Sequence, residues 1–312
     1  MSETILPMRD GSVLLADVID WYMGQYAGRD TSRVQRMAWW KGELGKLRLD
    51  ELDDDAVHAA LERLAQLPNR FYAGEDAEGK PIYRARRKPI GPATVNRYSA
   101  ALGAVCSWAM RKRITPKGWQ HPCRAIARRP EGNGKTRFLS DDERVRLLDA
   151  CKASKWPRLY LLVLLGMTTG ARRGELLGLR WRDIDMARAE AHIVRSKNSD
   201  ARVLPLVPAA VEEMKRFEGA PTALVFASTR RPDVPYHLEN RWREALRVAR
   251  VRNFRMHDLR HSCASWLAQS GASLLEIADV LGHRQISVTR RYAHLATGHK
   301  AQLVQRVLGA IK

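Results

Sequence analysis

The sequence predicts a fold that is mainly α with a small β-sheet, divided between two domains. The chain has 312 residues, too many for one typical domain and about right for two. Apolar residues recur at helical spacing over most of its length. Only two short segments, 190–195 and 201–206, have strand character, and an Asn/Asp/Ser-rich turn separates them. These observations indicate a helical protein with one local hairpin.

The charge of the chain indicates a polyanionic partner. Lys and Arg number 54 against 34 Asp and Glu, a formal excess of +20. Such an excess favours nucleic acid first and an anionic membrane surface second. The longest apolar run, 159–167, is too short to span a bilayer, so we expect no membrane association. The cysteines are scattered, and the N-terminus has no export signal, so a reducing cytoplasm is expected.

The first domain, residues 1–130, is predicted to be a helical bundle. Four helices are expected, over 12–27, 31–44, 53–67 and 92–113. Residues 69–91 form a basic insertion, in which 75–80 predict a turn and 81–90 a basic strand or loop. A bundle rarely needs so long a connection, so we expect the insertion to contact DNA. Residues 115–137, rich in Pro, Gly and basic residues, are the expected linker.

The second domain, residues 131–312, opens with a helix whose capping box pairs Ser140 with Glu143. A buried helix is expected over 157–168, followed by the two strands. Further helices are expected over 208–217, 236–250, 257–270, 273–281 and 287–296, with an amphipathic tail helix over 299–311.

Tyr292 can be interpreted in two ways from spacing. Val288, Tyr292 and Leu295 fall on one face of a helix, and such a stripe is usually core. A tyrosine with an ordinary pKa near 10 is also a poor nucleophile unless its proton is removed. Residues 273–293 fit a helix-turn-helix as well, which would make the protein a DNA-binding regulator without catalysis.

Other segments favour chemistry on a phosphate. His257 and Arg260 share a helix face, and His261 adjoins them. Arg172 sits at a predicted helix start after Gly170, a good position for binding an anion, with Glu175 one turn later. Lys197 lies in the turn of the predicted hairpin, where it is either solvated or within reach of a leaving-group oxygen.

In chain order these segments are T-G-x-R-x-x-E at 169–175, the hairpin lysine, H-x-x-R-H at 257–261, L-G-H at 281–283, and a tyrosine nine residues later. This set, in this order and spacing, resembles the tyrosine recombinase (phage integrase) family. The resemblance covers about 136–296. The first domain is similar to the family's core-binding domain, with far less specific motifs.

The resemblance implies a set of phosphate-binding and proton-donating groups. Arg172 and Arg260 would bind the non-bridging oxygens of the scissile phosphate, and His283 would hydrogen-bond to the phosphate. Lys197 would protonate the 5′-oxygen leaving group. Two guanidiniums and imidazole groups can stabilise such a transition state without a metal.

The resemblance also implies the nucleophile and its neighbours. Tyr292 would attack the phosphate and form a 3′-phosphotyrosyl link, and His257 would handle the tyrosine proton. Glu175 matches the family's acidic residue, a structural partner of the site, and His261 would give support.

The implied function is site-specific DNA recombination, as in integration or excision of a prophage or mobile element. The implied partners are double-stranded DNA, three further copies of the chain in a tetramer on DNA, and an accessory DNA-bending protein. No cofactor or metal is expected, because the sequence has no P-loop and no acidic cluster with Mg²⁺-ligand spacing. The helix-turn-helix regulator and a type IB topoisomerase-like relaxing enzyme remain as alternatives.

Overall fold

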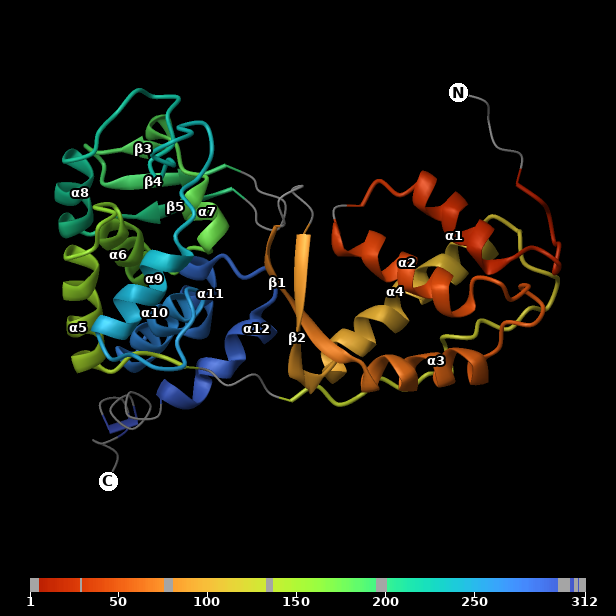
Figure 1. Ribbon diagram of the computed structural model, residues 1–312. Helices are drawn as coiled ribbons and strands as arrows, with labels where there is room; N and C mark the ends of the chain where they lie inside the picture. Colours follow the sequence, from red (N-terminus) through yellow and green to blue (C-terminus); the bar gives the residue numbers. More distant parts are fainter. Residues whose placement is uncertain are drawn as a thin grey trace. The chain divides into compact units, whose positions relative to one another are not determined.

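The computed structural model of the protein describes residues 6–28, 30–75, 81–132, 137–194 and 201–296, together with Val304, Gln305 and Leu308. The chain divides into two compact units, Met1–Asn133 and Gly134–Lys312. Each unit has its own buried apolar core. The fold is mostly helical, as the sequence predicts, but it has two small sheets where one was expected (Figure 1).

The first unit contains the four predicted helices, and each ends within three residues of its predicted bounds. They are α1 (Leu15–Gly24), α2 (Ser32–Leu44), α3 (Asp54–Gln66) and α4 (Pro92–Arg111). Local signals start two of them: the Asp53 carboxylate accepts from the Ala56 N–H at 2.8 Å, and a proline opens α4. The fully buried Trp40 donates its indole N–H to the Tyr98 carbonyl at 2.9 Å, which ties α2 to α4.

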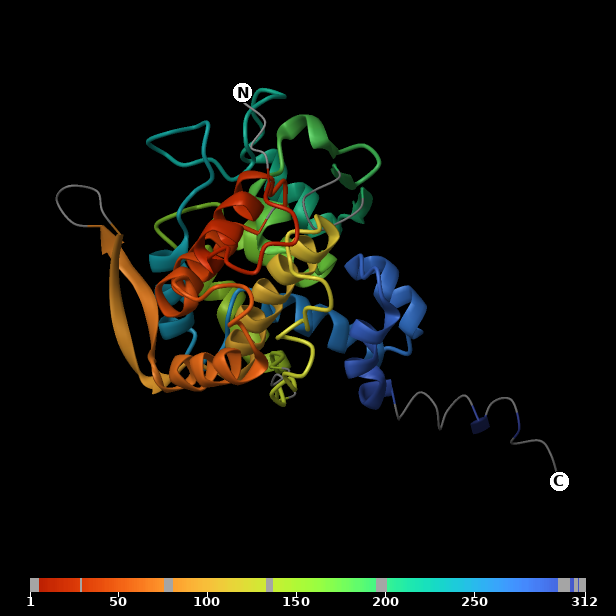
Figure 2. The ribbon, with the colours of Figure 1, turned by 90° about the vertical axis from the view of Figure 1, so that its right-hand side faces the viewer.

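The insertion between α3 and α4 is a β-hairpin. β1 (Pro68–Glu75) pairs antiparallel with β2 (Pro81–Pro89), and the described part of the ribbon stands apart from the helices of its unit (Figures 1 and 2). Residues 81–90 were predicted to be a basic strand or a loop, and most of them form a strand; the strand before the turn was not predicted. Most of the predicted turn, 76–80, lies outside the described residues.

The second unit is built around α6 (Leu159–Thr169), most of whose residues are buried. α5 (Asp141–Lys152) packs against it and begins with the predicted capping box, in which the Glu143 N–H donates to Ser140 Oγ at 3.2 Å. Gly170 ends α6 in the left-handed conformation, at φ +61°. A Cβ at this position would overlap the side chain of Leu281, so the turn toward Arg172 requires glycine.

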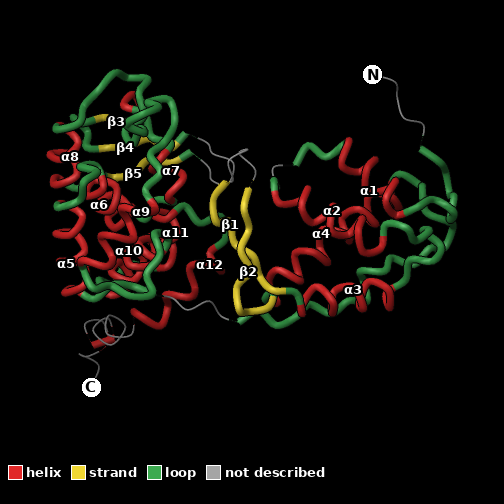
Figure 3. Tube along the Cα trace, viewed as in Figure 1, coloured by secondary structure: helices red, strands yellow, loops and turns green. Residues whose placement is uncertain are grey.

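A three-stranded antiparallel sheet lies at one end of this unit (Figure 3). Its order is β3 (Ile184–Asp185), β4 (Glu190–Ile193) and β5 (Arg202–Pro205). The hairpin of β4 and β5 was predicted. The two-residue β3, which follows the 3₁₀ turn η1 (Trp181–Asp183), is too short to show a period and was missed. Residues 195–200, which include Lys197, lie outside the described residues.

The remaining helices of the second unit follow the predicted order. They are α7 (Arg173–Leu177), α8 (Pro208–Lys215), α9 (Glu239–Val248), α10 (Asp258–Gln269), α11 (Leu274–Leu281) and α12 (Ile286–Thr289), with a 3₁₀ segment η2 (Arg290–Ala296). The tail helix predicted over 299–311 lies outside the described residues except at Val304, Gln305 and Leu308. Within the described ranges, no helix is both long and apolar enough to cross a membrane.

The prediction of one α-helix over 287–296 is wrong. The chain leaves the α-conformation after Thr289 and continues as 3₁₀ helix. With three residues per turn, Thr289, Tyr292 and Leu295 form the inward face. Thr289 and Tyr292 are buried, and Leu295 packs against the same cluster. Val288, which the 3.6-residue period placed on that face, is 39% exposed.

Candidate active site

Tyr292 is held in a small apolar cluster, with its hydroxyl on a histidine. Its side chain is 1% exposed and packs with residues of α10 and α11 that include Cys263 and Leu281. The hydroxyl hydrogen-bonds with Nδ1 of His261 at 2.5 Å. Burial raises the pKa of Tyr292, while the charges of Arg291 and Arg260 act in the opposite direction. The tyrosine is therefore held protonated, beside one specific base.

His261 is buried and neutral. Burial and the neighbouring His257 lower its pKa from 6.5 to about 4. A neutral imidazole protonated at Nε2 can accept the tyrosine proton at Nδ1. The family resemblance implies that His257 handles this proton, yet in the structure His261 forms the hydrogen bond with the hydroxyl. His257 lies at the start of α10, where it is only partly buried and more exposed than His261, with its ring 5.2 Å from that of His261.

Arg260 is a buried cation with an unused donor. Its residue exposure is 4%, and Nη1 donates to the Gly170 carbonyl at 2.8 Å. Nη2 is buried and has no hydrogen-bond partner within the described part of the chain. Burial and the nearby Arg172 lower its pKa to about 10, so the group stays charged at neutral pH. A buried guanidinium with an unmet N–H has a strong tendency to bind an anion.

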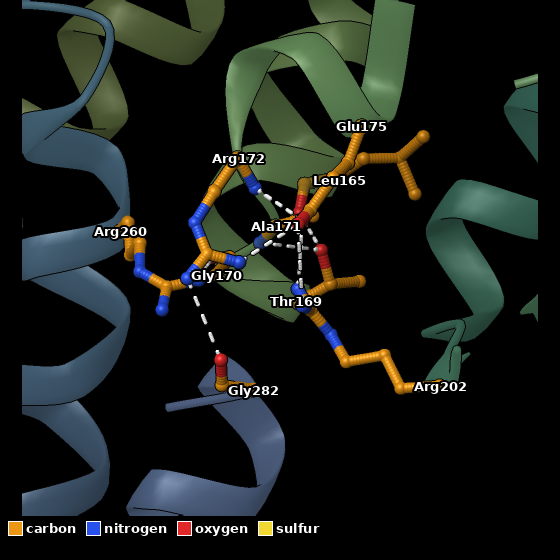
Figure 4. Close-up of polar contacts among 9 residues, drawn as sticks. All are labelled: Leu165, Thr169, Gly170, Ala171, Arg172, Glu175, Arg202, Arg260 and Gly282. Atoms are coloured by element: carbon orange, nitrogen blue, oxygen red, sulfur yellow. Dashed lines mark hydrogen bonds and ion pairs between the residues drawn. The ribbon is translucent and has the colours of Figure 1, made fainter. Parts of the chain in front are cut away.

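Arg172 is fixed from two sides at the start of α7 (Figure 4). Nη1 donates to Glu175 Oε1 at 2.8 Å, and Nη2 points to the Gly282 carbonyl at 3.4 Å. The backbone N–H of Arg172 donates to Glu175 Oε2 at 2.8 Å, so the carboxylate holds both ends of the same residue. About a third of the Arg172 side chain remains exposed, 32%, which leaves it accessible to a ligand.

Sequence reasoning missed a third arginine, Arg202, at the start of β5. Nη2 donates to Glu175 Oε2 at 2.9 Å, and the Arg202 side chain is 11% exposed. The Glu175 side chain is 3% exposed, so one buried carboxylate lies between two guanidiniums (Figure 4). The only local indication of Arg202 in the sequence was its position at the start of a strand, just after the turn predicted around Lys197.

His283 follows the Gly282 turn and faces the same arginines. Its Nδ1 lies 2.7 Å from Thr289 Oγ1, a hydrogen bond that joins the turn to α12. Burial lowers its pKa to about 4, and the charges of Arg260 and Arg172 add to the effect. The pKa of His257 is lowered for the same two kinds of reason, partial burial and the charge of Arg260. These neighbours show that both imidazoles lie in a strongly positive environment.

The predicted site residues therefore meet in one region of the second unit, apart from Lys197, which lies outside the described residues. Four elements supply them: the start of α7, α10, the turn between α11 and α12, and η2. Across the described ranges no group of three or more His, Cys, Asp or Glu side chains could hold a metal ion. The arrangement can bind an oxyanion through arginine donors and present a tyrosine hydroxyl to it.

Comparison with known proteins gives consistent matches. A family model described as "Phage integrase family" matches residues 137–299. The chain is 27% identical to the integrase of Salmonella phage P22 over 298 residues, which cover 87% of this chain and 73% of that protein. It is 33% identical to the type 1 fimbriae regulatory protein FimE of Escherichia coli K12 over 183 residues, 55% of this chain and 92% of FimE.

Other relatives are longer than the matched region. The chain spans about half, 52%, of the shufflon-specific DNA recombinase of Escherichia coli, at 30% identity over 209 residues and 67% of this chain. Two solved structures share the fold. The Tn1549 transposon integrase in complex with a circular intermediate DNA has a TM-score of 0.70 at 15% identity, over 95% of this chain and all of that one. A λ integrase dimer bound to a core site has a TM-score of 0.64 at 18% identity, over 90% and 95%.

Proposed function

The chain belongs to the phage integrase family and is a site-specific DNA recombinase, and we propose that it cleaves DNA with Tyr292 and rejoins it through a 3′-phosphotyrosyl intermediate. One observation carries this proposal. The Tyr292 hydroxyl rests on a neutral histidine, close to a buried arginine with an unmet donor. A packing tyrosine needs neither neighbour.

We propose that Arg172 and Arg260 bind the scissile phosphate. The unmet Nη2 of Arg260 and the exposed part of Arg172 support this role, because both are charged donors already fixed by protein contacts. Donors that are fixed before the reaction stabilise developing charge without reorganisation. His283, which is neutral, would add a hydrogen bond to the same phosphate.

The proton of Tyr292 is proposed to move to His261. With a pKa of about 4, His261 is a weak base in the absence of DNA. A bound phosphate brings negative charge to the region and raises the pKa of a nearby imidazole. Proton removal is therefore coupled to substrate binding, so the free protein keeps a protonated, inactive tyrosine. His257, whose ring adjoins His261, would tune that imidazole and not touch the hydroxyl.

The cleavage step forms one bond to phosphorus and breaks another. The Tyr292 oxygen forms a bond to phosphorus while the bond to the 5′-oxygen breaks. We propose that Lys197 protonates this leaving oxygen. A 5′-hydroxyl from another strand can reverse the step, because the phosphotyrosyl bond keeps the phosphodiester's energy. The reaction therefore exchanges strands, where a hydrolase would only cut.

The first unit, with its linker over 115–137, is proposed to complete a clamp around double-stranded DNA. The described side chains of the β1–β2 hairpin include exposed basic groups at Arg70, Arg84, Arg87 and Lys88. These groups support a role of the hairpin on the phosphate backbone. Strand exchange between two duplexes needs four active sites, so we propose a tetramer on DNA. An accessory bending protein and a mobile-element target belong to the same proposal.

The proposal is tested with a nicked suicide duplex, in which the released strand is too short to religate. The wild-type chain should form a protein–DNA adduct that survives denaturant, and Tyr292→Phe should not. Tyr236→Phe is the matched control, since Tyr236 stacks on Trp156 in the core of the same unit. Tight binding with no adduct from any variant would favour the helix-turn-helix regulator. An adduct with relaxation but no strand exchange would favour the topoisomerase-like enzyme.

A further inference from the structure

Arg202 joins three segments of the active site. It opens β5, five positions after Lys197 in the sequence. Its guanidinium donates to both oxygens of Glu175, to Oε2 at 2.9 Å and to Oε1 at 3.4 Å. It also packs on the turn between α11 and α12, where a Cβ added to Gly282 would lie 3.0 Å from Arg202 Cζ. One side chain thus links β5 to the segments that supply Arg172 and His283.

The contacts of Glu175 make the position of Arg172 depend on Arg202. Each carboxylate oxygen accepts from both arginines: Oε1 from the two Nη1 atoms, and Oε2 from the Arg172 backbone and Arg202 Nη2. With Arg202 removed, a buried carboxylate would lose half of these donors and could rotate. The guanidinium of Arg172, which is fixed mainly by that carboxylate, would move with it.

Arg202 also changes the charge available to a substrate. An ion pair made only of Glu175 and Arg172 would have no net charge. With Arg202 added, the three side chains carry a net charge of +1, and the burial of Glu175 and Arg202 keeps solvent from screening it. Burial lowers the pKa of Arg202 itself, with the Glu175 charge acting in the opposite direction. Arg172 can therefore attract a phosphate although it is paired with a carboxylate.

We propose that Arg202 is a positioning residue for DNA cleavage. Through Glu175 it holds the guanidinium of Arg172 in place and leaves it with positive charge for the scissile phosphate. This inference rests on the proposed function of the site. Arg202 itself does not touch the substrate.

The first test is a double-mutant cycle on the rate of adduct formation. Arg202→Met keeps much of the side-chain volume and removes the charge, and the rate should fall by roughly 10²-fold, the effect of misplacing a fixed group by about an ångström. Glu175→Gln should also slow the reaction, and the double variant should be no slower than the slower single variant. Additive losses would overturn the inference, because they would mean that Arg202 does not act through Glu175.

The matched control is Arg158→Met. Arg158 is another partly buried arginine of the same unit, and its Nη1 donates to the Val225 carbonyl at 2.5 Å, in the core and outside the site. The Arg158→Met variant should cleave DNA at the wild-type rate. Equal losses in both variants would mean that removal of a buried arginine alone slows cleavage, and would overturn the inference.

A second substrate separates positioning from general structural damage. In a methylphosphonate duplex, a methyl group replaces a charged oxygen of the scissile phosphate, so the charge of Arg172 matters less. The loss caused by Arg202→Met should shrink on this substrate, as should the loss caused by Arg172→Met. The same loss on both substrates would contradict a role through Arg172. If Arg202→Met does not fold, Arg202→Lys gives the same comparison, because it keeps the charge but cannot bridge both oxygens.

The proposed function and the role of Arg202 can be refuted separately. A wild-type chain that forms no Tyr292-dependent adduct would refute the proposed function, and with it the inference. A wild-type chain that cleaves, beside an Arg202→Met variant that cleaves equally fast, would refute only the role of Arg202.

Discussion

Gly282→Ala is a single-methyl probe of the active-site arginines. Gly282 has φ +66° and ψ 52°, in the left-handed region. An alanine there costs roughly 1–2 kcal/mol of folding free energy. Its Cβ would also overlap Nη1 of Arg202. The smallest movement that removes this overlap is a shift of the flexible Arg202 guanidinium, which takes it away from Glu175.

The substitution should therefore have two separable effects. The free energy of unfolding, measured with urea, should fall by roughly 1–2 kcal/mol, as expected for the backbone conformation alone. The rate of adduct formation should fall by roughly 10²-fold, because Arg172 loses its fixed position. Affinity for duplex DNA should change little, since the exposed basic groups of the hairpin, such as Arg84 and Arg87, lie outside this arrangement.

Gly118→Ala is the matched control for the backbone. Gly118 also has positive φ, +81°, but a Cβ there would have nothing within 4 Å. It should lower stability by a similar amount and leave cleavage unchanged. If Gly282→Ala is destabilised as expected and still cleaves at the wild-type rate, the arrangement of Arg202, Glu175 and Arg172 does not matter for catalysis.

Three further predictions concern packing, pH and DNA affinity. Gly170→Ala, at φ +61° and against an apolar side chain of α11, should lower the free energy of unfolding in urea by roughly 2–4 kcal/mol, and an unchanged value would contradict the packing. His261 and His283 each have a pKa lowered from 6.5 to about 4, so between these pH values the unfolded chain binds more protons and stability falls as the pH falls. From pH 7 to pH 5 the free energy of unfolding should fall by about 2 kcal/mol for each histidine. In His283→Gln the fall should be smaller by the contribution of that one histidine. An equally large fall in this variant would contradict a buried neutral imidazole at position 283. Replacing Arg84 and Arg87 of the hairpin with Gln should weaken DNA binding and reduce the slope of log affinity against log salt by about 2, whereas an unchanged slope would mean that the hairpin does not touch phosphates.

The helices of the first unit could be predicted because their signals are local. The apolar period and the residues at each helix start, such as Asp53, lie within a few positions of one another. β3 has only two residues and cannot show a period. The prediction for the segment after Thr289 was wrong for another reason. Helical periods of 3.6 and 3.0 residues both place Tyr292 and Leu295 on the inward face. They differ only in whether Val288 or Thr289 joins them, which packing decides.

The active site likewise has residues that could be predicted from the sequence and residues that could not. Motif order in the sequence pointed to Arg172, Arg260 and Tyr292, and the structure brings these residues into one region. The partner of the tyrosine hydroxyl could not be predicted, because His257 at the N-cap of α10 and His261 within it are four residues apart, and the packing of η2 on α10 selects between them. Arg202 was missed because its significance lies in a contact with Glu175, 27 positions away in the chain.

The most direct test of the central claim is to identify the residue that carries the DNA. The denatured adduct from the suicide duplex is digested with protease and nuclease, and the peptide that retains a nucleotide is sequenced by mass spectrometry. We expect a 3′-phosphate linked to Tyr292, within the segment 290–296. A nucleotide on another side chain, or a 5′-linkage, would contradict it.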